Sequence, residues 1–454
     1  MGLHNIEKKS LGYIMLKIWA KFWHNKIYYR NFTLLGTENI PFDKPLIFTP
    51  NHQNALMDAL ALLFSIKKQL VFLARADIFK KPSIARILYF LKILPIYRVK
   101  DGFDTVKKNK DIILKTVDII TSGNAMVILP EGNHSGIRRL RPLKKGFARM
   151  AFQAEEANDF LLDVHIVPVG LDYDDYQKFR SSLIVKFGEP IAVKEYNKLY
   201  KETPSIAINK ITQRLSEHLK PLIVNIESEE YYEFYNELRD IYRSRMAQHL
   251  NVDVKDERNR VYIDQQLIDR VTSFANQNPD TLNKYQQTIN KFVKLRDQFG
   301  FTNSIIDQKG INFFNLIGSS ISLLATLPLF LYGVVNNFLS IWFPVKLSKK
   351  FEDPQFKSSI RYVISLLSFP VFYIIQSIAV LIIFADWKIG LVYFISLPLS
   401  ASFAWCWYNT ISTIRAGWNY RKILMSKDNN FNEMQKLYDE IIIFGDRIMS
   451  ENKI

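Results

Sequence analysis

Cysteine is almost absent from this sequence, since Cys406 is the only one in 454 residues. A single cysteine excludes an intramolecular disulfide framework and fits a reducing compartment. Long Lys/Arg blocks, zinc-finger spacing and recognisable nucleic-acid motifs are also missing. The net charge of +16 favours an anionic partner. Because apolar runs of bilayer length are present and nucleic-acid motifs are not, we expect that partner to be the lipid bilayer, with no nucleic acid.

General disorder is excluded by the composition. Hydrophobic residues make up 48% of the chain, and 33 Phe and 22 Tyr are among its aromatic residues. A chain of 454 residues has room for two or three domains. Its mean hydropathy of -0.05 averages a charged first two thirds and an apolar last third. The two parts therefore predict different architectures.

The N-terminus lacks the pattern of a cleavable signal, because lysines interrupt it and no small-residue cleavage site follows. Within residues 1–30, apolar residues instead recur on one helical face: Leu11, Ile14, Met15, Ile18, Trp19, Phe22 and Trp23. This pattern predicts an amphipathic N-terminal helix. It suits a helix lying in the membrane interface and equally a helix packed on the domain behind it.

Short apolar runs alternate with helical patterns over residues 31–225. Strands are expected at 45–49, 70–74, 92–98, 125–129, 164–171 and 182–187, and helices at 58–67, 83–91, 103–122, 145–155 and 206–224. This alternation predicts an α/β domain with a mostly parallel sheet flanked by helices. The proline in Ile166-Val167-Pro168-Val169 suits an edge strand or a widened position in the sheet.

The rest of the chain predicts helices only. Residues 226–305 are polar and are expected to form a helical connector. Residues 306–412 are expected to be membrane-embedded, and a cytoplasmic C-terminal helix is expected at 413–454. The membrane-embedded part contains apolar runs at 311–345, 362–385 and 389–411, and each of the last two is long enough for a hydrocarbon core of ~30 Å.

The positions of basic residues predict how the apolar runs are oriented in the membrane. Only Asp386-Trp387-Lys388 separates the last two runs, which therefore form a tight antiparallel hairpin. Basic residues flank it on both sides and favour the cytoplasm: Lys346, Lys349, Lys350, Lys357 and Arg361 before it, and Arg415, Arg421, Lys422 and Lys427 after it. A re-entrant or interfacial course of 311–345, broken around Pro328, puts these clusters on one side. We expect an integral membrane protein with its N-terminal domain on the cytoplasmic face.

A histidine and a carboxylate lie close together where a predicted strand gives way to a predicted helix. His52 and Asp58 follow the apolar run 45–48 and precede or open the helix-like run 59–63. A carboxylate beside an imidazole fixes the tautomer and stabilises the imidazolium, which is the arrangement of a general base. For the pair considered alone, a structural histidine near an acid is the alternative.

Three further blocks follow in order: Pro95-Ile96-Tyr97-Arg98, Pro130-Glu131-Gly132-Asn133-His134-Ser135 and Ile166-Val167-Pro168-Val169. Together with Asn51-His52 and Asp58, they resemble the ordered motifs of the phospholipid/glycerol acyltransferase family, over roughly residues 31–225. The resemblance implies a membrane-bound O-acyltransferase of phospholipid synthesis. It would move a fatty acyl group from acyl-CoA or acyl-ACP to glycerol 3-phosphate or 1-acylglycerol 3-phosphate. The donor is a co-substrate, and no cofactor or metal is implied.

The resemblance also implies a role for each matching residue. His52 is the expected base, Asp58 its partner, and Arg98 the expected ligand of the substrate phosphate. Glu131, Gly132 and Ser135 are expected in the acceptor site. The basic residues that follow suit the phosphates of coenzyme A, of phosphopantetheine or of lipid headgroups: Arg138, Arg139, Arg141, Lys144 and Lys145. Structural alternatives stay open, with Arg98 paired to an acid, Glu131 orienting its loop, and the basic run forming a solvated patch.

The acceptor stays open because the sequence argues both ways. Five residues separate His52 from Asp58 where most members have four, which resembles the fungal-type glycerol-3-phosphate and dihydroxyacetone-phosphate acyltransferases. The segment 140–146 instead resembles lysophosphatidate acyltransferases. His134 and its neighbour Asn133 stand where the family motif usually carries an arginine that helps to hold phosphate. That role would pass to His134 or to the basic residues after it.

A protein of another class is the alternative: a non-catalytic lipid-binding or membrane-scaffold protein with the same fold. A scaffold has no need of a base beside a carboxylate. The presence of His52 and Asp58 together with Arg98 and Glu131 therefore favours the enzyme.

Overall fold

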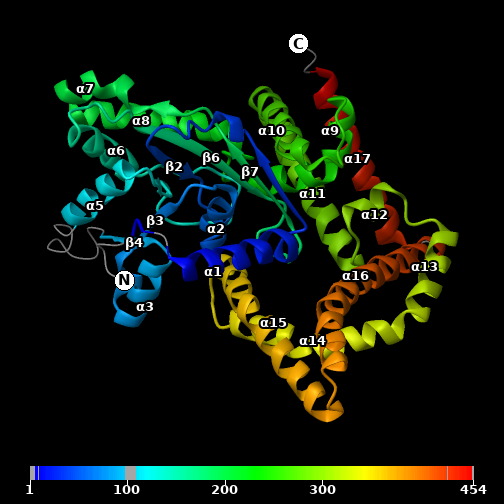
Figure 1. Cartoon of the computed structure of the whole chain (residues 1–454). Coiled ribbons are helices and arrows are strands. Elements are labelled where there is room, and N and C mark those ends of the chain that lie inside the picture. The colour runs from blue at the N-terminus through cyan, green and yellow to red at the C-terminus, as the bar shows by residue number, and fades with distance from the viewer. Residues whose placement is uncertain (1–5, 9, 98–108, 427, 452–454) are drawn as a thin grey trace. The chain divides into compact units, whose positions relative to one another are not determined.

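A computed structural model describes residues 6–8, 10–97, 109–426 and 428–451 (Figure 1). The chain divides into two compact units. Unit 1 contains the chain up to Glu227 together with Asp256–Val261 and Phe351–Tyr362, and unit 2 contains the rest. Unit 1 therefore takes up two short segments that lie beyond the α/β region predicted at 31–225.

One sheet forms the centre of unit 1. Among the described residues it has eight strands in the order β1-β7-β6-β2-β5-β3-β4, with β8 paired to β6. The strands are β1 (Asn31–Leu35), β2 (Leu46–Pro50), β3 (Leu70–Arg75), β4 (Ile93–Ile96), β5 (Ala125–Val127), β6 (His165–Tyr173), β7 (Ser182–Phe187) and β8 (Ile191–Ala192). Neighbours pair in parallel except where β6 meets β7 and β8. The predicted mostly parallel α/β sheet is confirmed, and β1 and β8 are strands that the sequence pattern does not predict.

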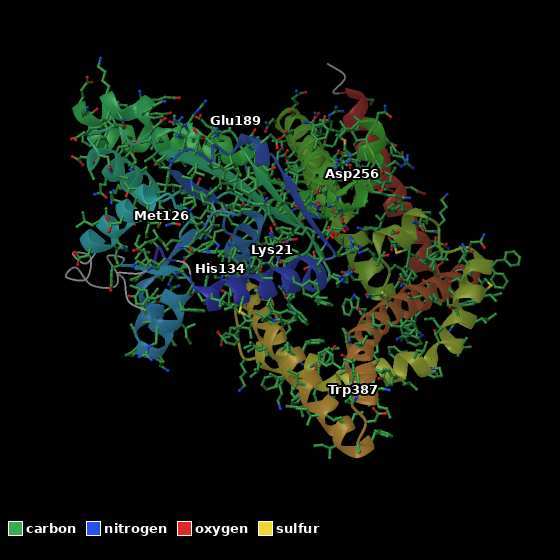
Figure 2. All side chains as sticks on the ribbon, in the orientation of Figure 1. Lys21, Met126, His134, Glu189, Asp256 and Trp387 are labelled. Atoms are coloured by element: carbon green, nitrogen blue, oxygen red, sulfur yellow. The ribbon has the colours of Figure 1, made fainter. Side chains whose placement is uncertain are left out.

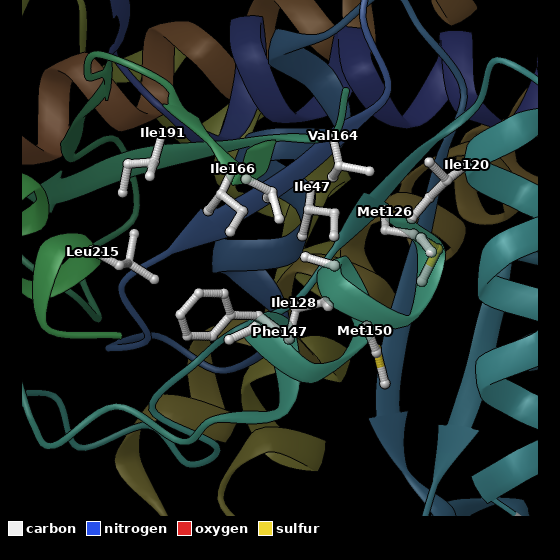
Figure 3. Close-up of a cluster of buried hydrophobic side chains, with 14 of the residues drawn as sticks. Ile47, Ile120, Met126, Ile128, Phe147, Met150, Val164, Ile166, Ile191 and Leu215 are labelled. Carbon is white, nitrogen blue, oxygen red and sulfur yellow. The ribbon is translucent and has the colours of Figure 1, made fainter. Parts of the chain in front are cut away.

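Helices cover the sheet, and their apolar faces build the core with it. The helices around the sheet are α2 (Leu56–Ser65), α3 (Pro82–Phe90), α5 (Asn109–Thr121), α6 (Gly146–Glu156), α7 (Asn197–Glu202) and α8 (Pro204–Leu219). In Figure 3, Ile47 of β2 and Ile166 of β6 pack with Phe147 of α6 and Leu215 of α8, and all four are buried. Burying each such side chain stabilises the fold by about 1.5–3 kcal/mol. Because strand residues alternate between faces, Leu46 and Phe48 point to the other side of the sheet, away from this cluster.

Pro168 lies in the interior of the sheet, since β6 is flanked by β2 and β7. Its missing N–H is tolerated because β8 pairs with residues 165–166, β7 pairs with residues 169–173, and Pro168 falls in the gap between them. Its carbonyl still accepts the Gly188 N–H at 3.0 Å. The structure thus places this proline inside the sheet and not on an edge strand.

Gly170 on β6 lies against the backbone of Leu222. An ideal Cβ at Gly170 would lie 2.4 Å from the Leu222 carbonyl oxygen. We expect Gly170→Ala to lower the free energy of unfolding by about 1–3 kcal/mol, because backbone must shift to relieve the overlap. Gly146→Ala is the matched control, since nothing lies within 4 Å of its ideal Cβ. Thermal unfolding of both variants checks this, and equal midpoints would contradict it.

The N-terminal pattern forms the helix α1 (Leu11–Phe22), continued by the π-helical segment η2 (Trp23–Tyr28). Tyr13 and Ala20 are buried and pack on the rest of unit 1, where Tyr13 meets the ring of Phe90 edge-on. Four apolar side chains on another face are 49–74% exposed: Leu11, Met15, Ile18 and Phe22. The helix therefore packs on the domain through one side and presents an apolar stripe on another, as helices of the membrane interface do.

Unit 2 consists of helices and their connections within the described residues. Its polar part contains α9 (Tyr232–His249), most of α10 (Arg260–Gln277), α11 (Pro279–Phe299) and α12 (Asn303–Asp307). Arg239 and Arg243 of α9 each bind Asp264 of α10 at 2.8 Å. Although burial alone would raise it, these two guanidinium groups lower the pKa of Asp264 to about 2. The region expected as a helical connector is thus held together by a buried ion-pair cluster.

Within the described part of the chain, three helices are long and apolar enough to cross a membrane: α14 (Leu327–Ser348), α15 (Pro354–Phe384) and α16 (Trp387–Ser426). The shorter apolar helix α13 (Phe313–Ala325) ends one residue before α14 begins, so the expected break around Pro328 is present. Residues 385–386 alone separate α15 from α16, which gives the expected tight link. The border expected at residue 412 falls inside α16, and α17 (Asn429–Glu451) follows.

Candidate active site

The loop between β2 and α2 carries the histidine predicted as the base. Asn51 fixes the start of this loop, because its side chain donates to the Leu171 carbonyl at 3.1 Å and accepts the Leu171 N–H at 2.6 Å. Ala55 ends the loop with a φ of 47°, a sparsely populated value for a residue other than glycine. The loop is therefore clamped to β6 at one end and held in a strained turn at the other.

Asp58, in the first turn of α2, organises the loop from inside. Its side chain is fully buried. Oδ2 accepts bonds from the backbone N–H groups of Gln53 at 2.8 Å and Asn54 at 2.7 Å, and from Nδ1 of His52 at 2.8 Å. Oδ1 accepts the Tyr173 hydroxyl at 2.8 Å. Burial, and next the charge of Asp58, raise the pKa of Tyr173 well above its ordinary value, so this hydroxyl stays protonated and donates. These donors offset the cost of burying a charged carboxylate.

His52 has one ring nitrogen left for a substrate. Because a carboxylate oxygen only accepts, the bond from Nδ1 to Asp58 places the ring proton on Nδ1. Nε2 then carries the lone pair, as a general base requires. The side chain is 16% exposed, so the fold holds it while leaving part of it accessible.

Glu131 connects the His52 loop with the basic segment that follows the Pro-Glu-Gly block. Its Oε1 accepts the backbone N–H of His52 at 2.7 Å, and its Oε2 accepts Nε of Arg141 at 2.9 Å. Burial raises the pKa of Glu131, while the His52 N–H and Arg141 act in the opposite direction. The carboxylate of Glu131 thus fixes both the backbone of His52 and the guanidinium of Arg141.

Two buried polar atoms in this region have no hydrogen-bond partner among the described residues: Nη2 of Arg141 and Oγ of Ser135. Buried polar groups are normally paired, so both are available to a ligand with acceptor oxygens. Gly132, with a φ of 75°, turns the chain before Ser135, and the Gly136 N–H donates to the Gln53 carbonyl at 3.1 Å. That bond ties the Pro-Glu-Gly loop to the His52 loop.

The lysines and arginines after this loop divide into two kinds. Lys144 and Lys145 are exposed and Arg139 is half-buried. Arg138 is buried, and its guanidinium binds Asp172 at 2.8 Å and the carbonyls of Tyr173 at 2.6 Å and Asp174 at 3.0 Å. These bonds engage the guanidinium of Arg138 at the end of β6. It therefore has a structural position, and not the phosphate-binding position predicted for it.

Arg98, the predicted phosphate ligand, lies outside the described residues. Of the other predicted residues, the structure brings His52, Asp58 and Glu131 into one bonded group, with Gly132 and Ser135 on the adjoining loop. Tyr173 belongs to this group without having been predicted. The sequence gives only a weak signal for Tyr173, because a tyrosine in a buried strand is indistinguishable from the other core positions there. Within the described residues, no three His, Cys, Asp or Glu side chains are grouped so that they could hold a metal ion.

His134 lies beside the base, with the two imidazole ring centroids 5.4 Å apart (Figure 2 labels His134). Its Nε2 bonds to Oδ2 of Asp353 at 2.7 Å. Asp353 lies 219 residues further along the chain, yet it belongs to unit 1. No local pattern in the sequence could connect the two.

Comparison with known proteins agrees with this geometry. Residues 31–172 match the family model described as Acyltransferase. Glycerol-3-phosphate O-acyltransferase 2 of Saccharomyces cerevisiae is 33% identical over 112 residues, which cover 24% of this chain and 15% of the yeast protein. Glycerol-3-phosphate O-acyltransferase 1 of the same yeast is 31% identical over 144 residues, which cover 31% of this chain and 19% of that protein. The matches thus span less than a fifth of either yeast protein.

The alignments with a bacterial relative and with a solved structure cover a larger share of those proteins than the alignments with the two yeast proteins do. The 1-acyl-sn-glycerol-3-phosphate acyltransferase of Borreliella burgdorferi is 23% identical over 188 residues, which cover 41% of this chain and 66% of that protein. The crystal structure of the 1-acyl-sn-glycerophosphate (LPA) acyltransferase from Thermotoga maritima aligns at 19% identity with a TM-score of 0.32, over 46% of this chain and 80% of that one.

A histidine bonded to a carboxylate on a strand-to-helix loop, tied to a Pro-Glu-Gly block, is the arrangement expected of an acyltransferase domain. The match over residues 31–172 agrees with that class. The match over residues 31–172 and these relatives support the phospholipid/glycerol acyltransferase family that the ordered blocks predict.

Proposed function

We propose that this protein is a membrane-bound O-acyltransferase of phospholipid synthesis. It transfers a fatty acyl group from acyl-CoA or acyl-ACP to the hydroxyl of glycerol 3-phosphate or 1-acylglycerol 3-phosphate. The observation that carries the proposal is the bond from Nδ1 of His52 to the buried Asp58 at 2.8 Å, which leaves Nε2 as the base. The names of the yeast and Borreliella relatives support the choice of acceptors.

The mechanism follows from the free nitrogen of His52. Nε2 removes the proton of the acceptor hydroxyl as its oxygen attacks the thioester carbonyl, and Asp58 stabilises the imidazolium that forms. The C–O bond forms, the C–S bond breaks, and the departing sulfur takes the proton back from His52. The products are an ester and a free thiol. The acceptor itself is the nucleophile, so no acyl-enzyme is formed.

Arg141 is suited to the acceptor's phosphate. Its Nε is held by Glu131, and its buried Nη2 has no partner among the described residues. A phosphate oxygen would complete this fork, and Ser135 Oγ is a further donor of the same loop. The exposed Lys144 and Lys145 then suit the phosphates of the acyl donor or lipid headgroups.

We expect Arg141→Ala to raise the KM for a phosphorylated acceptor about 10-fold to 100-fold, because a hydrogen bond between charged groups is lost. Arg141→Lys should recover only part of the affinity, since an ammonium lacks the fork. Arg149→Ala is the control, an exposed arginine of α6. Steady-state kinetics with varied acceptor make the measurement. Equal KM values for Arg141→Ala and Arg149→Ala would remove Arg141 from the phosphate site.

Membrane attachment is proposed from two features. The helices α14, α15 and α16 have the length and apolarity of membrane spans. The exposed apolar stripe of α1 suits the membrane interface. The basic residues around the α15–α16 hairpin favour a cytoplasmic position for the catalytic domain.

The direct test offers purified protein in lipid two donors, acyl-CoA and acyl-ACP, each with glycerol 3-phosphate or 1-acylglycerol 3-phosphate. We expect one acceptor to be acylated at a rate well above the protein-free control, with mass spectrometry identifying the product. No product in any of the four mixtures would overturn the enzyme and leave the lipid-binding scaffold, for which phospholipid binding without turnover is the expected result.

A further inference from the structure

A segment far from the acyltransferase domain in sequence lies at its active site. Residues 353–362 contain Asp353 and the first turns of α15, and they belong to unit 1. We call them the C-terminal clamp. The match to the Acyltransferase family model ends at residue 172. The clamp therefore lies beyond the matched domain region.

One end of the clamp contacts the loop next to the base. Oδ2 of Asp353 lies 2.7 Å from Nε2 of His134, and the Phe356 ring meets the imidazole edge-on at 5.1 Å. Gln355 packs so tightly on Gly136 that an ideal Cβ there would lie 1.7 Å from its amide nitrogen. The imidazole of His134 is thus held by two contacts, the carboxylate of Asp353 and the ring of Phe356.

The other end is fixed on the His52 loop and on the N-terminal helix. The Ser358 hydroxyl donates to Oδ1 of Asn54 at 2.9 Å, and its carbonyl accepts the Tyr28 hydroxyl at 3.0 Å. The Tyr362 hydroxyl donates to the carbonyl of Ala20 at 2.8 Å. Ser358 and Tyr362 are almost fully buried, so the clamp is an integral part of unit 1.

The chemistry of the contact defines the state of His134. The carboxylate of Asp353 only accepts, so Nε2 of His134 carries the proton in this bond. Partial burial raises the pKa of Asp353, but the bonds from His134 and from the backbone N–H groups of Gln355 and Phe356 outweigh it and lower that pKa below its ordinary value. Because Asp353 occupies Nε2 of His134, the other ring nitrogen, Nδ1, is the atom left to meet a ligand.

We propose that Asp353 is a positioning residue of the active site, which holds His134 so that its other ring nitrogen binds the phosphate of the acceptor. This inference rests on the proposed function. The position of His134 beside His52, at 5.4 Å between ring centroids, puts this imidazole next to the base. A phosphate bound there is close enough for the hydroxyl of the same small molecule to reach Nε2 of His52.

The test uses the full-length protein in lipid and compares Asp353→Asn with Glu352→Gln, which removes the same charge one residue earlier from an exposed side chain. Asp353→Asn is expected to raise the KM for the phosphorylated acceptor about tenfold with kcat changed less than about twofold. Glu352→Gln is expected to leave both unchanged. Asp353→Glu, which keeps the carboxylate, should show a smaller rise in KM than Asp353→Asn.

Repeating the Asp353→Asn substitution in the His134→Arg variant distinguishes a positioning role of Asp353 from a structural one. A guanidinium has no imidazole ring for a carboxylate to position, so in His134→Arg the further change Asp353→Asn should alter KM less than about twofold. An equal rise in both backgrounds, or a lowered unfolding midpoint that accounts for the loss, would make Asp353 structural and overturn the inference. An unchanged KM in Asp353→Asn would overturn it as well, with the proposed function intact. A wild-type protein without acyl transfer would instead overturn the proposed function and this inference with it.

Discussion

Replacing His52 by alanine is expected to lower kcat for acyl transfer by about 10²–10⁴-fold, the usual contribution of a general base. The reason is local. Nδ1 is bonded to Asp58, so Nε2 carries the lone pair that must take the proton of the acceptor hydroxyl. The KM for both substrates should change little, because the bond between Arg141 and Glu131, at the proposed phosphate site, does not involve the imidazole. Initial rates at saturating donor and acceptor give the measurement.

His218→Ala serves as the control for this change. His218 is a half-buried histidine at the end of α8, where Nδ1 lies 3.2 Å from the Glu189 carbonyl. It should retain the wild-type kcat. A His52→Ala variant that turns over at the rate of His218→Ala would show that another group removes the proton.

The second large effect is expected for Asp58→Asn, with kcat lowered by about 10³–10⁴-fold while the protein still folds. The amide oxygen of asparagine can replace Oδ2, which accepts the N–H groups of Gln53 and Asn54 and the Nδ1 of His52. Its amide nitrogen can donate to the Tyr173 hydroxyl in place of Oδ1. The hydrogen bonds can therefore be kept, but the negative charge that stabilises the imidazolium is lost.

Tyr173→Phe gives the matched comparison, because it removes only the hydroxyl bonded to Oδ1 and leaves the charge. Its kcat should fall less than about tenfold. The unfolding midpoints of Asp58→Asn and Tyr173→Phe are measured in parallel with kcat. A similar kcat for the two variants would mean that Asp58 acts through loop geometry rather than through its charge.

The sheet and the pairing of His52 with Asp58 were predictable because their signals are local. Apolar runs of strand length separated by helical patterns give the α/β sheet, whatever the neighbours of each strand. His52 and Asp58 lie within one strand-to-helix connection, so their six-residue spacing in sequence already brings them together. The short strand β8 has only two residues and pairs only with β6, which leaves too little pattern to recognise.

Roles that depend on distant partners were not predictable in this way. Arg138 stands in a run of basic residues that the sequence presents as equivalent, yet Asp172 and the end of β6 bury it. Arg141, three residues later in the same run, instead bonds to Glu131 beside the His52 loop. The contact of Asp353 with His134 crosses 219 residues, and nothing in either neighbourhood of the sequence indicates it. Burial and tertiary pairing decide which of several similar charges reaches the site.

Direct activation of the acceptor hydroxyl by His52 has a kinetic consequence that can be measured. The most direct measurement is the release of free thiol from the acyl donor, followed continuously with and without acceptor for the wild type and His52→Ala. We expect one thiol per ester formed, no release without acceptor, and a rate in the variant lower by about 10²–10⁴-fold. Thiol release without acceptor, or at the wild-type rate in His52→Ala, would contradict it.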